Sequence, residues 1–118
     1  MIIGLGTDLV ETIRIKEAIA GNLRFVGKLL TENELATYNE IRNEKRQVEF
    51  VAGRWAAKEA FAKAYGTGIS SQLHFHDIEV SNDEKRKPII LCDKVTSPVH
   101  VTISHTDHYA TATVIIEA

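Results

Sequence analysis

The sequence contains few cysteines, prolines and aromatic residues, and it has no long apolar run. Its single cysteine, Cys92, excludes an intrachain disulfide and is typical of a protein in a reducing compartment. The N-terminal residues lack the basic flank and apolar core of a secretion signal. No stretch approaches the ~18 apolar residues of a transmembrane helix. We therefore expect a cytoplasmic protein that does not enter a membrane.

The sequence also has no large excess of acidic or basic residues. The formal net charge is −2, which argues against a general nucleic-acid binder. Residues 41–63 nevertheless hold more basic than acidic side chains, and a local basic field of this kind can steer an anionic ligand or partner. The charged residues of this segment are Arg42, Lys45, Arg46, Arg54, Lys58 and Lys63 against Glu44, Glu49 and Glu59.

The length and the hydrophobic pattern predict one α+β domain covering residues 1–118. The first half has a short strand, Ile2 to Asp8, followed by helical patterns, and the second half changes to the period of two that is typical of strands. We expect the first strand to join an antiparallel sheet built by the later ones. The predicted helices are residues 10–20, 24–30, 31–41 and 45–65, and the predicted later strands are residues 78–81, 88–92, 99–104 and 110–116.

The longest predicted helix, residues 45–65, has apolar side chains on more than one side. Val51 and Trp55 lie on one side, and Phe61 and Tyr65 lie on another. A helix of this type packs from several directions, as a central helix or a helix at a subunit contact does.

This helix carries a carboxylate and an ammonium one turn apart, because Glu59 and Lys63 are separated by four residues. A carboxylate that can bind a hard cation, beside a lysine that can bind a phosphate oxygen, indicates chemistry on a phosphorylated substrate. The alternative is a surface ion pair that contributes a few tenths of a kcal/mol.

Asp8 is the second acidic candidate, since it follows Gly4-Leu5-Gly6-Thr7 at the expected end of the first strand. It could face a cleft, or it could cap the following helix. If the strand end and the long helix meet, Asp8 and Glu59 can together hold Mg²⁺ and leave its other positions to water and phosphate. The segments Gly66-Thr67-Gly68 and Ser104-His105-Thr106 are weaker candidates: the first resembles a phosphate loop only loosely, and His105 could contact a phosphate or have no role.

Three segments together resemble a known family. They are Gly4 to Glu11, the run from Phe50 to Ala64 that includes Trp55-Ala56-Ala57-Lys58-Glu59-Ala60-Phe61, and Val101 to Thr106. In order and spacing they are similar to the small bacterial 4′-phosphopantetheinyl transferases of the holo-[acyl-carrier-protein] synthase family. The resemblance covers essentially the whole chain. It implies an antiparallel sheet against a long central helix, in a homotrimer that binds coenzyme A between subunits.

The resemblance also implies a reaction and a set of site residues. The family transfers 4′-phosphopantetheine from coenzyme A to a serine of apo acyl carrier protein in fatty acid biosynthesis and releases adenosine 3′,5′-bisphosphate. By position, Asp8 and Glu59 match the Mg²⁺ ligands and Lys63 matches the lysine at the pyrophosphate. All three are catalytic candidates, and which group is the base does not follow from sequence.

Further residues are expected to bind the two substrates. The candidates for the remaining phosphates of coenzyme A are Arg46, Arg54, Lys63, His105 and Thr106, with the backbone of Gly66, Thr67 and Gly68 alongside. The positions that match the carrier-protein surface of the family are Arg14, Arg24 and Phe25. Two other functions stay open at this point: a module that holds a phosphorylated ligand without turnover, and a structural domain whose Glu59–Lys63 pair has no chemical role.

Overall fold

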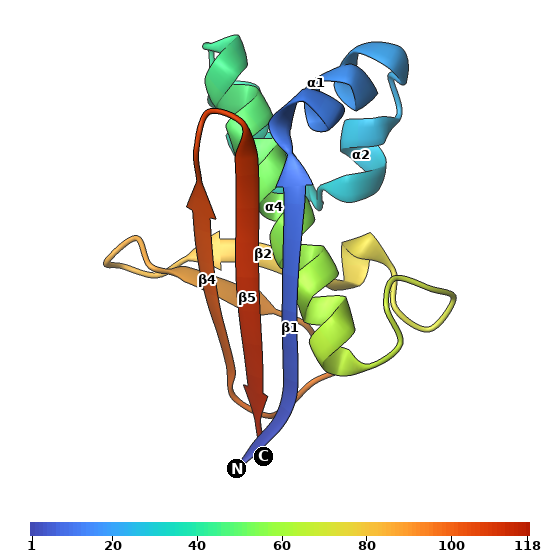
Figure 1. Cartoon of the computed structure of the whole chain (residues 1–118), viewed down its shortest axis with the longest axis vertical. Coiled ribbons are helices and arrows are strands. Elements are labelled where there is room, and N and C mark those ends of the chain that lie inside the picture. The colour runs from blue at the N-terminus through green and yellow to red at the C-terminus, as the bar shows by residue number, and fades with distance from the viewer.

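A computed structural model describes all residues, 1–118, and confirms the α+β fold with an antiparallel sheet packed on a long helix. Figure 1 shows three strands side by side along helix α4, with α1 and α2 at one end. The helices are α1 (Thr12–Gly21), α2 (Phe25–Leu29), α3 (Glu32–Glu40) and α4 (Glu44–Tyr65), and a 3₁₀ turn, η1, spans Phe75–Asp77. The strands are β1 (Ile2–Glu11), β2 (Glu79–Asn82), β3 (Pro88–Leu91), β4 (Val99–His105) and β5 (Tyr109–Glu117). None of the helices is both long enough and apolar enough to cross a membrane.

The main sheet has three antiparallel strands in the order β1-β5-β4, and β2 and β3 form a separate hairpin. The first strand thus joins the sheet made by the last two, as predicted. Helix α4 covers one face of this sheet only. On the other face of β1, Leu5 and Leu9 are 67% and 65% exposed. The sheet therefore presents apolar side chains on a face that no other element of the chain covers.

Local signals set the boundaries of α3 and α4. The Thr31 hydroxyl accepts the backbone N–H of Glu34, whose carboxylate accepts the Thr31 N–H, so the predicted capping box is present. Helix α4 begins after Asn43, whose side chain accepts the Arg46 N–H, and it ends at Gly66, which has φ 111°.

The central position predicted for α4 is confirmed. Half of its 22 residues are buried. Ala56, Phe61 and other residues on one side pack against the sheet and the hairpin, whereas Val51 and Ala52 pack against Leu29 and the other residues under α1 and α2. The helix is thus shared between two hydrophobic clusters.

Strand β1 is longer than predicted. It continues through Val10, which we had assigned to the first helix, because its pairing with β5 extends to the Glu11–Tyr109 pair. Helix α1 begins only at Thr12, whose N–H donates to the carbonyl of His108 and whose hydroxyl donates to the carbonyl of Asp107. The predictions that Asp8 ends the strand, or caps the helix, are therefore wrong: Asp8 lies inside β1.

Candidate active site

Two glycines let β1 lie directly on α4. Gly4, Gly6 and Asp8 share one face of the strand because its side chains alternate. A Cβ at Gly6 would lie 2.0 Å from the backbone oxygen of Ala60, and a Cβ at Gly4 would lie 2.3 Å from that of Ala64. With no side chain between the two backbones at these points, the next residue on this face, Asp8, comes against the same helix.

The structure brings Asp8, Glu59 and Lys63 together at the edge where β1 meets α4. The Lys63 ammonium donates to the carbonyl oxygen of Thr7 at 2.9 Å and lies 3.3 Å from the Asp8 carboxylate. The Asp8 side chain is 15% exposed, whereas that of Lys63 is 52% exposed. Lys63 therefore pairs with Asp8 across the two elements, and no ion pair joins it to Glu59 one turn earlier.

Both carboxyl groups have raised pKa values. Burial raises the pKa of Asp8, and the Lys63 ammonium opposes this shift. Burial, together with the neighbouring Asp8 carboxylate, raises the pKa of Glu59, and Lys63 again opposes. A carboxylate that raises the pKa of a neighbouring carboxylate also favours the arrival of a further cation at the pair.

The donor set at this edge fits a partly coordinated hard cation. One Asp8 oxygen, Oδ2, is buried and has no hydrogen-bond partner, although a buried carboxylate oxygen normally has one. The chain has no group of three or more His, Cys, Asp or Glu side chains that could enclose a metal. Mg²⁺ does not need such a cage, because it commonly takes one or two carboxylates and completes its shell with water and substrate phosphates.

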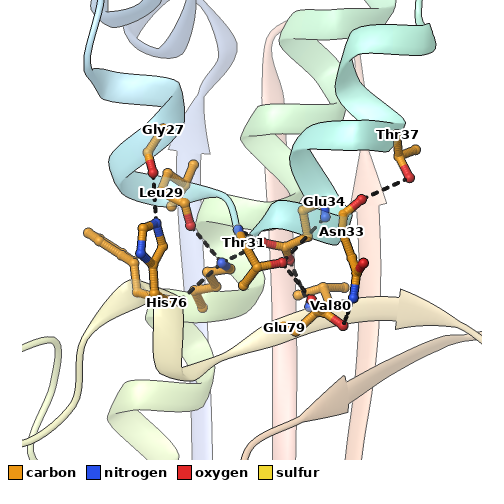
Figure 2. A network of polar contacts seen from close by, with 11 residues as sticks. Gly27, Leu29, Thr31, Asn33, Glu34, Thr37, His76, Glu79 and Val80 are labelled. Atoms are coloured by element: carbon orange, nitrogen blue, oxygen red, sulfur yellow. Dashed lines mark hydrogen bonds and ion pairs between the residues drawn. The ribbon is translucent and has the colours of Figure 1, made fainter.

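The other lysine of this helix segment, Lys58, is not at the surface. It is 0% exposed, and its ammonium lies 2.6 Å from the carboxylate of Glu34. Figure 2 shows Glu34 with Thr31 and Val80, where α3 meets β2. The basic excess that we counted over residues 41–63 is therefore smaller at the surface than in the sequence, since one of its six cations is paired in the interior.

The two arginine candidates lie apart from Glu59 within one chain. Arg54 precedes Glu59 by five residues and so points about 140° away around the helix. Its guanidinium lies over the ring of Phe50, 4.0 Å from the ring centre, and its Nε is buried without a hydrogen-bond partner. Arg46 is exposed in the first turn of α4, about 20 Å from Glu59 along the helix axis.

The two loop segments proposed to bind phosphate make hydrogen bonds or close polar contacts to other groups of the same chain. The N–H groups of Gly66 and Gly68 both donate to the carbonyl of Ala62 and thereby cap α4. At the end of β4, the His105 ring lies 3.7 Å from the Glu49 carboxylate. The Thr106 hydroxyl accepts the N–H groups of His108 and Tyr109, so it shapes the turn before β5.

The three positions assigned to a partner surface lie beside an apolar groove. Arg14 is 75% exposed on α1 and pairs with Glu11, and Arg24 is exposed just before α2. Phe25 packs its ring 5.9 Å from that of Trp55. The groove has a volume of about 600 Å³, and its lining includes Leu9, Ile15, Phe25, Trp55, Tyr109 and Arg14.

Trp55 places this groove next to the acidic site, and sequence reasoning missed the connection. Trp55 lines the groove and lies one helical turn before Glu59. The sequence feature that could have revealed it is the spacing of four residues between Trp55 and Glu59, which predicts neighbouring positions on the helix surface.

An α+β domain with two carboxylates and a lysine at an open edge is typical of an enzyme that acts on phosphorylated substrates. The comparison with known sequences agrees: the chain belongs to the 4′-phosphopantetheinyl transferase superfamily, whose sequence model matches residues 4–114.

Individual relatives are similar over their whole length. The chain is 51% identical to the holo-[acyl-carrier-protein] synthase of Bacillus subtilis (strain 168), over 99% of this chain and 97% of that protein. It is 50% identical to the synthase of Anoxybacillus flavithermus, with the same coverage. Among solved structures, the synthase of Bacillus anthracis str. Ames in complex with CoA (3′,5′-ADP) superposes with a TM-score of 0.93 at 43% identity, covering 100% of this chain and 98% of that one. The Helicobacter pylori synthase in complex with coenzyme A gives 0.83 at 28% identity, covering 96% and 99%.

Proposed function

We propose that this protein is a Mg²⁺-dependent enzyme that transfers 4′-phosphopantetheine from coenzyme A to a serine of apo acyl carrier protein and releases adenosine 3′,5′-bisphosphate. The observation that carries the proposal is the meeting of Asp8, Glu59 and Lys63 at one edge, in a chain about half identical to holo-[acyl-carrier-protein] synthases. The proposed compartment is the cytoplasm, in keeping with one unpaired cysteine.

The three side chains suit the steps of this transfer. Mg²⁺, when held by Asp8 and Glu59, supplies charge neutralisation at the diphosphate of coenzyme A. The serine oxygen attacks the phosphorus that bears the pantetheine arm, and the bond from that phosphorus to the oxygen of adenosine 3′,5′-bisphosphate breaks. Glu59 accepts the serine proton as the proposed base. Lys63 neutralises the negative charge on the departing phosphate.

Intact-mass spectrometry of apo acyl carrier protein tests this function. Incubation with the enzyme, coenzyme A and Mg²⁺ should add the mass of one phosphopantetheine group to the carrier, and EDTA should prevent the gain. A carrier whose acceptor serine is replaced by alanine is the matched control and should not change mass. Coenzyme A binding without any mass gain would instead support a module that holds the ligand, and no binding at all would support a structural domain.

The groove beside α1 is the proposed docking site for the carrier. Its apolar lining lies one helical turn from Glu59, and Arg14 and Arg24 are exposed near it. The carrier proteins of this family are strongly acidic, so basic residues here would speed encounter and fix the orientation of the bound carrier.

Reversing one of these charges should slow the encounter. Arg14→Glu is expected to lower kcat/KM for the carrier about threefold to tenfold at low salt and to weaken its salt dependence. The measurement is steady-state transfer at several salt concentrations with carrier protein varied. Lys85→Glu, a reversal in the β2–β3 turn, should have little effect, and unchanged kinetics in Arg14→Glu at low salt would exclude Arg14 from the docking surface.

A homotrimer with coenzyme A between subunits is the proposed assembly. Two observations support it. The outer face of the sheet carries exposed Leu5 and Leu9, which a neighbouring copy can cover. In addition, Arg46, Arg54 and His105 do not converge with Glu59 within one chain, so an adjacent subunit is the proposed source of these contacts to the phosphates of coenzyme A.

A further inference from the structure

Lys58 lies next to Glu59 in the sequence but contributes nothing to the site formed by Asp8, Glu59 and Lys63. Its ammonium donates to Glu34 Oε1 and to the carbonyl of Leu29 at 2.6 Å each, and to the carbonyl of Phe75 at 3.1 Å. An ammonium has three protons, so all of its donors are used inside the protein. A role for Lys58 in binding phosphate is therefore excluded.

The partner of Lys58 is held equally firmly. Glu34 Oε1 also accepts the N–H of Thr31 at 2.9 Å, and Glu34 Oε2 accepts the N–H of Val80 at 2.7 Å. Figure 2 shows Leu29, Thr31, Glu34 and Val80 gathered between the end of α2, the start of α3 and β2. One buried ion pair thus ties α4 to α2, α3, η1 and β2.

This ion pair holds α4 from the side opposite to β1. Residues two apart on a helix point about 200° apart, so Lys58 and Ala60 lie on opposite sides of α4. Gly6 of β1 packs against the backbone at Ala60. The helix is therefore held between the first strand on one side and the Lys58–Glu34 pair on the other.

The Glu59 side chain has no polar contact of its own, so its direction depends on how α4 is held. No hydrogen bond or ion pair joins the Glu59 carboxylate to another residue, whereas Asp8 contacts Lys63. Its place opposite Asp8 is consequently set by the rotation of α4. A rotation of about 10° moves a carboxylate carried about 6 Å from the helix axis by about 1 Å. A displacement of that size can cost about 100-fold in rate.

We propose that Lys58 is a positioning residue for the transfer reaction: its buried pair with Glu34 fixes the rotation of α4, so that Glu59 faces Asp8 at the metal and diphosphate site. The inference rests on the proposed function. Buried ion pairs can often be replaced by apolar residues without loss of stability, and their better attested contribution is to select one arrangement of the packed elements.

The test removes both charges together, so that an effect on the position of Glu59 can be measured in a protein that still folds. Lys58→Met alone leaves the Glu34 carboxylate buried without a partner and is expected to unfold the protein. Lys58→Met/Glu34→Gln removes both charges and keeps an acceptor for a backbone N–H.

In this double variant, Mn²⁺ binding should weaken about tenfold or more, measured by electron paramagnetic resonance with coenzyme A and without carrier protein. The kcat should fall at least about tenfold. With Mg²⁺ saturating, the KM for coenzyme A should change less than about threefold, because both side chains of the pair are buried and cannot touch the coenzyme. Lys85→Met, an exposed lysine replaced in the same way, should match the parent.

Circular dichroism establishes that the double variant is folded before either measurement. A folded double variant with Mn²⁺ affinity and kcat within about twofold of the parent would overturn the inference, because the pair would then serve stability alone.

If the double variant does not fold, Glu34→Asp replaces it, since this change keeps both charges and shortens the acid by one methylene. It should weaken Mn²⁺ binding in the same direction, and unchanged binding would overturn the inference. A parent protein that binds no Mn²⁺ with coenzyme A also overturns it. A parent that binds Mn²⁺ but transfers nothing contradicts the proposed function instead.

Discussion

Replacing Glu59 by alanine is expected to lower kcat/KM for transfer by about 10³-fold or more, because the change removes both a metal ligand and the proposed base. Asp8→Ala should have an effect of the same order, since the buried Asp8 Oδ2 has no other partner and is free to bind the metal. The measurement is the initial rate of carrier-protein modification over a range of Mg²⁺ concentrations.

Both variants should remain folded. A carboxyl group whose pKa is raised on folding stabilises the protein only while it is protonated, and this contribution is lost as the pH rises through the folded pKa. Above their folded pKa values the two acids therefore do not stabilise the fold, and their removal there should not lower the melting temperature. Glu84→Ala, in the β2–β3 turn, is the matched control for loss of an exposed acid. Unfolded variants, or variants with parental activity, would contradict the assignment of the site.

The second large effect is expected at Gly6. A methyl group there would meet the Ala60 oxygen at 2.0 Å and the Ala64 nitrogen at 2.8 Å, and both are backbone atoms that cannot rotate away. Gly6→Ala must therefore push β1 off α4, at a cost of about 3 kcal/mol or more in the free energy of unfolding. The melting temperature should fall by an amount on the order of 10 °C. Urea denaturation followed by circular dichroism gives the free energy directly.

Gly27→Ala is the matched control for this substitution. Gly27 lies in helix α2, and a Cβ there meets no atom within 4 Å. In a helix, replacing glycine by alanine should raise stability by about 0.5–1 kcal/mol. Equal stabilities of the two variants would show that the close approach of β1 to α4 is unimportant.

Local signals made most of the fold predictable. The Thr31–Glu34 capping box, the Gly66 stop and the alternating strands each act over a few residues, so the sequence contains all of the information they need. The length of β1 was different, because its last residues pair with β5 at the far end of the chain. Long-range pairing overrode the helical pattern that began at Val10.

The site was predictable only in part for the same reason. The spacing of Glu59 and Lys63 is a property of one helix, whereas the approach of Asp8 depends on what Gly4 and Gly6 contact in the folded protein. Two glycines alternating ahead of an acid were the visible sign of that approach. The burial of Lys58 had no such sign, because lysine is almost always exposed and its partner, Glu34, lies on a different helix.

Lysine side chains of this protein differ greatly in their access to reagents in solution. Amine acylation requires an unprotonated nitrogen that a reagent can approach, and the nitrogen of Lys58 is enclosed by three acceptors. Lys63, about 1.4 turns further along the same helix, is half exposed. Chemical modification therefore distinguishes two amines that are only five residues apart, and the reactivity of Lys63 reports on occupancy of the site beside Asp8 without any change to the sequence.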